Sequence, residues 1–182
     1  MRIIGGNYRG KKLFTPENND VRPTADRARE AVFNILASKL ENRWPEYNLV
    51  DVFSGTGAFA LEALSRGVNS VCLIDKNTKL SAKNVNLFPQ EKERIRLITA
   101  DALRLPAAHR RYNLAFMDAP YQKGLSSLAL NELCDKGWLD KKALCIVEVE
   151  KTETLNVPES FEILDERVYG LAKFFFLQLK NI

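Results

Sequence analysis

Residues 51–64, which read DVFSGTGAFALEAL, carry the strongest indication of the fold. An apolar run that ends at Phe53 is followed by Gly55 and Gly57, and then by apolar residues at helical spacing. Glycine has no Cβ atom, so this turn lets the backbone approach a ligand closely. Turns of this kind lie where open α/β sheets bind small molecules. The spacing also satisfies the dinucleotide-binding pattern Gly-x-Gly-x-x-Ala, with Ala60 as the last member.

On both sides of this turn, short apolar runs alternate with amphipathic stretches, which is typical of a parallel sheet covered by helices. Five strands are expected, at residues 49–53, 71–75, 94–100, 112–118 and 143–150. Helices are expected among them, at residues 58–67, 77–88 and 123–138. Two last strands follow each other too closely for a crossover helix and predict an antiparallel hairpin, at residues 161–170 and 173–180. The sequence therefore predicts an α/β fold with a mostly parallel sheet.

The chain before this α/β region is basic and has its own pattern. We expect residues 2–6 and 11–15 to form a small β-hairpin around a glycine-containing turn, followed by a helix at residues 22–36. We therefore divide the chain into a basic N-terminal β-hairpin extension, residues 1–20, and a main domain, residues 21–182.

The composition predicts a compact cytoplasmic protein. At 182 residues with 46% hydrophobic content, the chain can bury the core of one domain. No apolar run reaches the roughly 20 residues that cross a bilayer, and the start lacks the features of a signal peptide. The three cysteines fit neither a disulfide framework nor a zinc site, so we expect reduced thiols and no metal, at Cys72, Cys134 and Cys145.

Acidic residues end or lie within three successive strands beside the glycine turn. Asp51 precedes the glycines, where its charge would repel a pyrophosphate and suit a cationic ligand. Among nucleoside cofactors, S-adenosylmethionine carries a sulfonium and an ammonium but no phosphate. Asp75 lies about 20 residues after Gly55, where an acid accepts hydrogen bonds from both ribose hydroxyls. Asp101, with the backbone of Ala102 nearby, is placed to accept a hydrogen bond from the adenine amine.

Each of these acids also has an ordinary structural explanation. Asp51 would also fit a buried, hydrogen-bonded or helix-capping acid. Asp75 would fit a cap of the next helix, and Asp101 a simple loop acid. Their occurrence together beside one glycine-rich turn favours a cofactor site.

The segment DAPY follows the fourth strand and lies at the same edge of the sheet. An exocyclic base amine is a poor nucleophile, because its lone pair is delocalised into the ring. The Asp118 carboxylate and the Ala119 carbonyl can hold the amine hydrogens and so orient the lone pair towards a methyl donor. Pro120 stiffens the turn, and Tyr121 offers a ring on which a base can stack. These four residues are our candidate catalytic residues.

Together with IIGGNYRGKKL at residues 3–13 and RPTADRAREAVFNIL at residues 22–36, these motifs resemble the RsmD-like family of bacterial methyltransferases. DAPY is similar to the family motif [DNS]-P-P-[YFW], with Ala119 in place of the first proline. The resemblance covers nearly the whole chain and implies a class I, Rossmann-like methyltransferase domain with seven strands. It also implies methylation of guanine N2 in 16S ribosomal RNA of the small ribosomal subunit, with S-adenosylmethionine as the donor.

The family's donor contacts match seven positions of this sequence: Asp51, Ser54, Gly55, Gly57, Asp75, Asp101 and Ala102. The departure at Ala119 leaves the backbone carbonyl in place, although the turn loses rigidity. The motif therefore remains compatible with catalysis.

The basic N-terminal region has two explanations. Taken alone, such a cluster is as often a solvated surface as a nucleic-acid contact. The resemblance favours RNA phosphate contacts by Arg9, Lys11, Lys12, Arg22, Arg27 and Arg29. Pairing with the neighbouring acids Asp26 or Glu30 is the structural alternative for Arg27 and Arg29.

Three other functions remain open at this point. The catalytic motif alone also fits methylation of adenine N6 in DNA, which the N-terminal motifs argue against. The glycine pattern fits an NAD-binding oxidoreductase, but His109, the single histidine, lies in an expected loop without a partner acid. The departure at Ala119 would fit an RNA-binding ribosome-assembly factor that does not catalyse. We expect a monomer.

Overall fold

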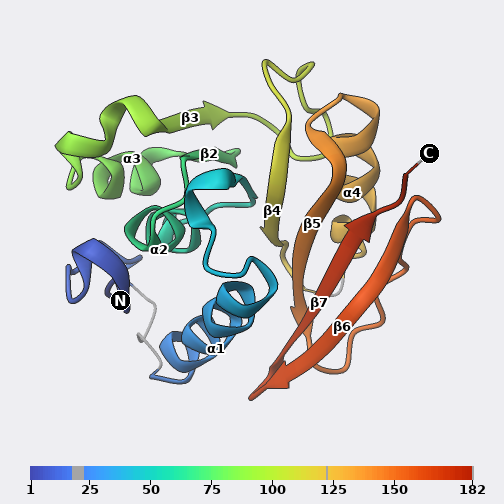
Figure 1. Ribbon diagram of the computed structural model, residues 1–182, viewed down its shortest axis with the longest axis horizontal. Helices are drawn as coiled ribbons and strands as arrows, with labels where there is room; N and C mark the ends of the chain where they lie inside the picture. Colours follow the sequence, from blue (N-terminus) through green and yellow to red (C-terminus); the bar gives the residue numbers. More distant parts are fainter. Residues whose placement is uncertain (18–22, 122, 182) are drawn as a thin grey trace.

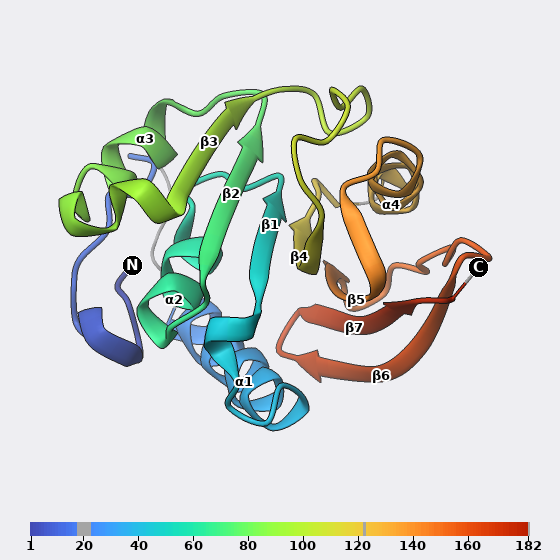
Figure 2. The same ribbon diagram turned by 45° about the horizontal axis from the view of Figure 1, so that its top comes forward.

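A seven-stranded sheet forms the centre of the protein (Figure 1, Figure 2). The computed structural model describes residues 1–17, 23–121 and 123–181. The strands are β1 (Asn48–Val52), β2 (Ser70–Asp75), β3 (Ile95–Thr99), β4 (Tyr112–Asp118), β5 (Leu139–Glu150), β6 (Phe161–Tyr169) and β7 (Ala172–Leu179). They lie in the order β3-β2-β1-β4-β5-β7-β6; β1 to β5 are parallel, and β7 is antiparallel to both of its neighbours. The predicted sheet and its C-terminal antiparallel hairpin are confirmed.

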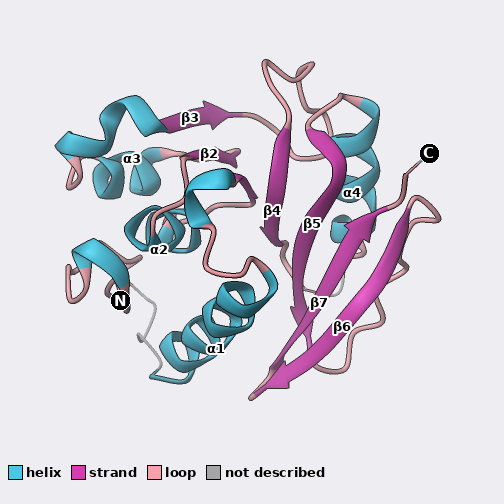
Figure 3. Cartoon of the chain, in the orientation of Figure 1, coloured by secondary structure: helices cyan, strands magenta, loops and turns pink. Residues whose placement is uncertain are grey.

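Helices cover both faces of this sheet (Figure 3). They are α1 (Pro23–Lys39), α2 (Ala58–Arg66), α3 (Lys79–Val85) and α4 (Leu125–Asp135), with the shorter 3-10 helices η1 (Gly6–Tyr8), η2 (Trp44–Glu46) and η3 (Pro89–Arg94). Buried residues of α1 and α2 pack on one face, and those of α4 pack on the other. Within the described ranges, no helix is both long enough and apolar enough to cross a membrane.

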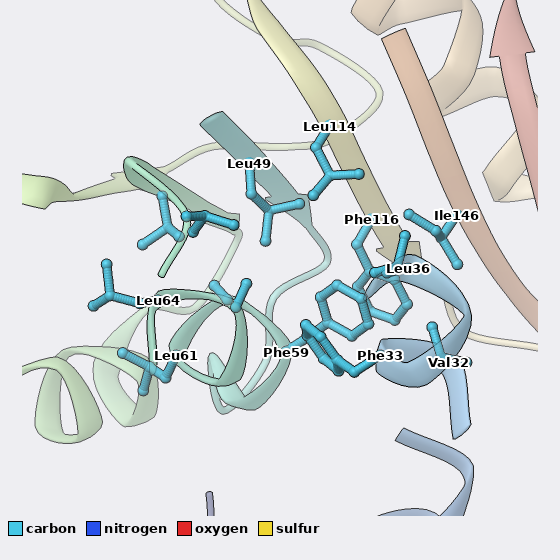
Figure 4. Close-up of a cluster of buried hydrophobic side chains, with 14 of the residues drawn as sticks. Val32, Phe33, Leu36, Leu49, Phe59, Leu61, Leu64, Leu114, Phe116 and Ile146 are labelled. Atoms are coloured by element: carbon cyan, nitrogen blue, oxygen red, sulfur yellow. The ribbon is translucent and has the colours of Figure 1, made fainter. Parts of the chain in front are cut away.

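Three phenylalanine rings join α1 and α2 to the sheet (Figure 4). Phe59 of α2 stacks on Phe116 of β4, with ring centroids 3.6 Å apart, and Phe33 of α1 lies 4.6 Å from Phe59. All three side chains are buried, and burial of each contributes roughly 1.5 to 3 kcal/mol to folding. Because Phe116 lies close to the carboxyl end of β4, the stack holds that end of the strand against both helices.

The N-terminal segment, residues 1–14, forms the predicted hairpin with shorter arms. The arms run antiparallel through the bridge between Arg2 and Lys12, with η1 at the turn. Three backbone hydrogen bonds join them: Ile3 N–H donates to the Lys11 carbonyl, Gly10 N–H to the Ile3 carbonyl, and Leu13 N–H to the Met1 carbonyl. The domain boundary expected between residues 20 and 21 lies outside the described residues.

Glu62 of α2 anchors the N-terminal segment. Its buried carboxylate accepts hydrogen bonds from the backbone N–H groups of Ile4 and Gly5, at 2.7 and 2.8 Å. The Arg66 guanidinium, one turn later on the same helix, donates to Glu62 at 2.8 Å and offsets its charge. A buried carboxylate with three donors is strongly held, so the segment and α2 form one packed unit.

Two glycines of this segment provide a test of the packing. Gly6 and Gly10 both have left-handed φ angles, 76° and 87°, so alanine costs about 1 to 2 kcal/mol of backbone strain at either position. A Cβ atom on Gly6 would lie 1.9 Å from the Ser65 carbonyl oxygen, whereas one on Gly10 would have no atom within 4 Å. We predict that Gly6→Ala lowers the free energy of unfolding by about 1 to 3 kcal/mol more than Gly10→Ala does, because only Gly6→Ala adds a steric overlap.

Urea denaturation of the two variants, with limited proteolysis near residue 6, measures this difference. Equal stability and equal cleavage would contradict the close packing of η1 on α2.

Candidate active site

Two adjoining pockets lie at the carboxyl ends of β1, β2 and β4. The first has a volume of about 390 Å³ and is lined by residues of α1, β1, β4, β5 and the β6–β7 turn. The second has a volume of about 630 Å³ and is lined mainly by residues that follow β2, β3 and β4. Phe53, Asp118 and Tyr121 line both pockets. A ligand that occupied both would pass these three side chains.

The predicted glycine turn joins β1 to α2. Gly55 and Gly57 have φ angles of 52° and 79°, in the left-handed region that glycine adopts without strain. A Cβ atom on Gly57 would lie 2.6 Å from Cδ2 of Leu73, whereas one on Gly55 would have no atom within 4 Å. Packing against β2 therefore requires Gly57, and Gly55 leaves the backbone of the turn open to a ligand.

The first pocket is lined by three residues with unsatisfied polar atoms. Among the described residues, the buried side-chain atoms without a hydrogen-bond partner are Asp51 Oδ1, Ser54 Oγ and Arg29 Nε. All three residues line the first pocket. Arg29 Nε lies 3.9 Å from the Glu62 carboxylate and forms an ion pair with it. Buried polar groups are nearly always paired, so the two other atoms, Asp51 Oδ1 and Ser54 Oγ, indicate a ligand with complementary groups. In the lining of this pocket, the Asp51 carboxylate would suit the ammonium and the Arg29 guanidinium the carboxylate of an amino-acid moiety, such as that of S-adenosylmethionine.

The charge of Asp51 depends on what lies beside it. Its other oxygen, Oδ2, accepts a hydrogen bond from the Ala60 N–H at 3.3 Å. Burial raises the pKa of Asp51 well above its usual range, and the charges of Asp118 and Asp75 raise it further. A cationic group in the pocket would reverse this effect and favour the carboxylate.

Asp75 lies where the sequence predicts it, between the glycine turn and the second pocket. It accepts hydrogen bonds from the N–H groups of Gly55 and Asn77, both at 2.9 Å. Asp75 also lines the second pocket. It therefore fixes the glycine turn and can still face a ligand.

Asp101 is held away from this arrangement. It accepts a hydrogen bond from the Leu103 N–H at 2.9 Å and pairs with Lys76 at 3.1 Å. These contacts, the backbone hydrogen bond first, lower the pKa of Asp101. The second pocket is lined by the next residue, Ala102, rather than by Asp101. The expected loop position of Asp101 is thus correct, but its carboxylate already has partners.

The DAPY turn lies at the boundary of the two pockets. Asp118 lines both, and Ala119 and Pro120 line the second. Tyr121 also lines both, and 42% of this residue is exposed. Its hydroxyl donates a hydrogen bond of 3.3 Å to Oε1 of Glu148. The structure therefore brings the four candidate catalytic residues together.

Glu148 of β5 is a site residue that the sequence analysis missed. It lines the first pocket and is the register partner of Asp118 in the parallel pair β4–β5. The residues two positions earlier, Ile146 and Phe116, lie in one buried cluster, so both strands direct these alternate side chains to the same face. Alternation along the run CIVEVE could have placed Glu148 on the side of the site.

Both carboxyl groups of this pair titrate near neutral pH. Asp118 is exposed at the end of β4, and partial desolvation by the neighbouring protein atoms raises its pKa to about 7. Desolvation, followed by the charge of Asp118, raises the pKa of Glu148 to about 8, although the hydrogen bond from Tyr121 acts in the opposite direction. Two such neighbours share a proton over this pH range.

The residues predicted to contact RNA differ in their surroundings. Lys11 is engaged within the protein, where its ammonium donates to the Leu87 carbonyl and lies 4.7 Å from the centre of the Phe88 ring. Arg22 lies outside the described residues. The remaining cations of the N-terminal region in this set are exposed: Arg9, Lys12 and Arg27.

Arg29 is largely buried and connects three parts of the structure. Its guanidinium donates to the Arg2 carbonyl at 2.5 Å and pairs with Asp26 at 3.2 Å. The same side chain lines the first pocket. Pairing with Asp26, the structural alternative noted for this residue, is therefore present.

Comparison with known proteins gives relatives along nearly the whole chain. Residues 1–178 match the family described as conserved hypothetical protein 95. Ribosomal RNA small subunit methyltransferase D of Escherichia coli strain K12 is 36% identical over 173 residues, which are 93% of this chain and 85% of that protein. The protein of the same name from Haemophilus influenzae is 30% identical over 180 residues, which are 96% of this chain and 91% of that protein.

Solved structures show the same relationship. One from Escherichia coli, described as a methyltransferase, has a TM-score of 0.81 and 35% identity and covers 99% of this chain and 98% of its own. One from Haemophilus influenzae, described as a methylase, has a TM-score of 0.78 and 28% identity, with the same coverage. The chain therefore belongs to the conserved hypothetical protein 95 family, the RsmD-like methyltransferases that its motifs resemble, with S-adenosylmethionine as the methyl donor.

Proposed function

We propose that the protein methylates the exocyclic N2 atom of a guanine in 16S ribosomal RNA of the small ribosomal subunit. The observation that carries this proposal is the position of Asp118, which lines both pockets. The unsatisfied polar atoms of the first pocket suit the amino-acid end of the donor. An amine held by Asp118 would therefore lie beside the donor site, as an in-line transfer requires.

The contribution of the chain is to hold and orient the amine. The Asp118 carboxylate accepts one amine hydrogen and the Ala119 carbonyl accepts the other, which localises the nitrogen lone pair. S-adenosylmethionine supplies an electrophilic methyl group, whose bond to sulfur breaks as the bond to nitrogen forms. Tyr121 holds the base by stacking, worth roughly 1 to 3 kcal/mol. The methylated amine loses its proton readily to water, so Asp118 need not be a strong base.

The donor contacts in this proposal divide between the two pockets. Asp51 would face the cationic end of the donor, and Asp75 would accept hydrogen bonds from its ribose hydroxyls. Ala102 lines the second pocket and would contact the adenine. Asp101 is already paired with Lys76, so its part in adenine binding would be to order the loop that carries Ala102. The turn residues Ser54, Gly55 and Gly57 would let the donor approach the backbone closely.

The proposed substrate comes from the relatives, which are named as ribosomal RNA small subunit methyltransferases. RNA phosphates would be bound by exposed cations of the N-terminal region, Arg9, Lys12 and Arg27, with Arg22 as a further candidate. Lys11 and Arg29 have internal partners and would shape this surface. The proposal places the protein in the cytoplasm as a monomer that binds the small subunit.

Ala119 motivates a second candidate, an RNA-binding assembly factor without catalytic activity. The residue is buried, and its substitution for the family proline leaves the turn less rigid. This candidate predicts binding to the subunit and no transfer.

The first test is transfer of labelled methyl from S-adenosylmethionine to small subunits that lack the modification, with naked 16S RNA and DNA alongside. We expect label in the subunit RNA and N2-methylguanosine after digestion to nucleosides. N6-methyladenine in DNA would replace the proposal with the DNA reaction. Donor binding with no label in any substrate would favour the assembly factor, and Ala119→Pro would then be the variant to test.

Replacing Asp118 separates chemistry from donor binding. We predict that Asp118→Ala lowers kcat/KM for the subunit at least about 100-fold, because the amine loses its charged acceptor, and leaves the donor Kd nearly unchanged. Asp140→Ala is the matched control, since Asp140 is exposed and lines neither pocket. Parallel loss of transfer and donor binding in Asp118→Ala would contradict the assigned role.

The pH profile should report the ionisation of the same carboxyl group. Asp118 has a pKa raised to about 7, so it is protonated below that pH and becomes a full acceptor above it. We predict that kcat/KM for the subunit rises from about pH 6 to about pH 8. Desolvation raises the pKa of Asp118, and the pKa of Glu148 is raised further, to about 8, so Glu148 is mostly neutral while Asp118 ionises. Glu148→Gln should therefore leave the midpoint near pH 7. The exposed Glu162→Gln serves as the control, and a flat wild-type profile would contradict the prediction.

A further inference from the structure

Glu148 stands beside a second carboxyl group without a cation to offset it. Asp118 and Glu148 are register partners on neighbouring parallel strands and project to the same face. Among the described residues, the ion pairs of the protein include neither of them. Two adjacent acids either repel each other or share a proton, and neither state favours folding, so this arrangement calls for an explanation other than stability.

The surroundings of Glu148 direct its carboxylate to the first pocket. Its register partner on the other side is Phe174 of β7, a buried aromatic residue. The Tyr121 hydroxyl occupies one carboxylate oxygen, Oε1. The other oxygen, Oε2, remains an acceptor, and Glu148 lines a pocket whose wall also contains Tyr169 of β6 and Leu171 of the β6–β7 turn. Apolar residues with one convergent acceptor form a surface suited to a flat, hydrogen-bonding ring.

A simpler explanation is that Glu148 only holds Tyr121 in place. That contact is a single hydrogen bond of 3.3 Å from a neutral hydroxyl, which an amide oxygen could accept equally well. Support of Tyr121 does not explain why an acid lies beside Asp118. A second hydrogen-bonding partner, which the substrate would bring, explains the position of this acid.

Guanine presents the pattern of donors that two neighbouring carboxylates can accept. Its N1–H lies next to the N2 amine, so the two donor groups point from the same edge of the ring. Adenine has an unprotonated N1 with a lone pair at the corresponding position, which a carboxylate would repel. An acceptor beside the amine-binding group therefore distinguishes the two purines.

We propose that Glu148 is a specificity-determining residue that accepts the N1–H of the target guanine while Asp118 and Ala119 hold its N2 amine. This inference rests on the proposed function and names the contact by which the same site would recognise guanine. Desolvation and the charge of Asp118 raise the pKa of Glu148 to about 8, and an N–H donor from the substrate would lower it and so favour the carboxylate that accepts the bond.

The test uses 2-aminopurine, which keeps the amine but has a lone pair in place of N1–H. Small subunits are assembled with guanine or 2-aminopurine at the methylated position, which is mapped first with the wild-type product. The full-length wild-type enzyme should prefer guanine by about 10- to 100-fold in kcat/KM, the effect of one hydrogen bond to a charged group. In Glu148→Ala, transfer to guanine should fall and this preference should approach one. Glu148→Gln should retain part of the preference, because its amide oxygen can still accept N1–H.

Two controls separate base reading from support of Tyr121. Tyr121→Phe removes the hydroxyl that contacts Glu148 and keeps the ring, so it should retain the guanine preference even if transfer slows. Glu162→Gln, on the exposed face of β6, should match the wild type. Measurements of donor binding and thermal unfolding identify any variant that misfolds. If Glu148→Ala misfolds, the isosteric Glu148→Gln still tests the proposal.

The outcomes distinguish this inference from the proposed function. Absence of N2-methylguanosine in wild-type subunits would remove the proposed function itself. Transfer to guanine with the same preference in the wild type and Glu148→Ala would overturn only the role of Glu148. Loss of the preference in Tyr121→Phe to the extent seen in Glu148→Ala would also overturn it, because Glu148 would then act through Tyr121.

Discussion

The alternation of side chains along the strands determines where every part of the site lies. On β4, Phe116 points into the core beneath α1 and α2, so Asp118, two residues later, points to the same face beyond the end of that core. On β5, Ile146 and Glu148 repeat the arrangement in register. A strand has a period of two, so the apolar residues that fix a strand on the helices also fix the direction of its terminal acid. The register between β4 and β5 thus places Asp118 and Glu148 side by side and, two residues earlier, places Phe116 in the phenylalanine stack.

This arrangement places polar groups where they contribute little to the stability of the protein without a ligand. Asp118 and Glu148 are neighbouring acids that share a proton near neutral pH, and Asp51 and Ser54 each leave a buried atom without a hydrogen-bond partner. An unsatisfied buried polar group costs about 1 to 3 kcal/mol, and burial of apolar residues on both faces of the sheet must offset this. The cost is concentrated in residues that line one pocket. Ligands that pair these groups therefore stabilise the fold as they bind.

Elements that depend on local pattern could be predicted from the sequence, and contacts between distant segments could not. The range expected for β4 matches the structure at both ends, because a buried strand is a continuous apolar run that stops at its first exposed acid. The N-terminal hairpin is present with shorter arms, but its attachment to Glu62, in a helix far along the chain, could not be predicted. The same reason explains Arg29, expected on the RNA surface and found in a pocket wall. The alternation of side chains along its strand could have predicted which face Glu148 occupies, but its position beside Asp118 depends on the register between β4 and β5.

Arg29 links the N-terminal segment to the first pocket, which Met1 of the same segment also lines. Its guanidinium is hydrogen-bonded to the Arg2 carbonyl of the N-terminal segment and also forms part of the wall of the first pocket. A ligand that displaced this segment would therefore also act on the pocket wall. If two ligands were coupled in this way, each would change the affinity for the other by the same factor. The N-terminal segment and the pocket are far apart in the sequence but share a contact through one side chain.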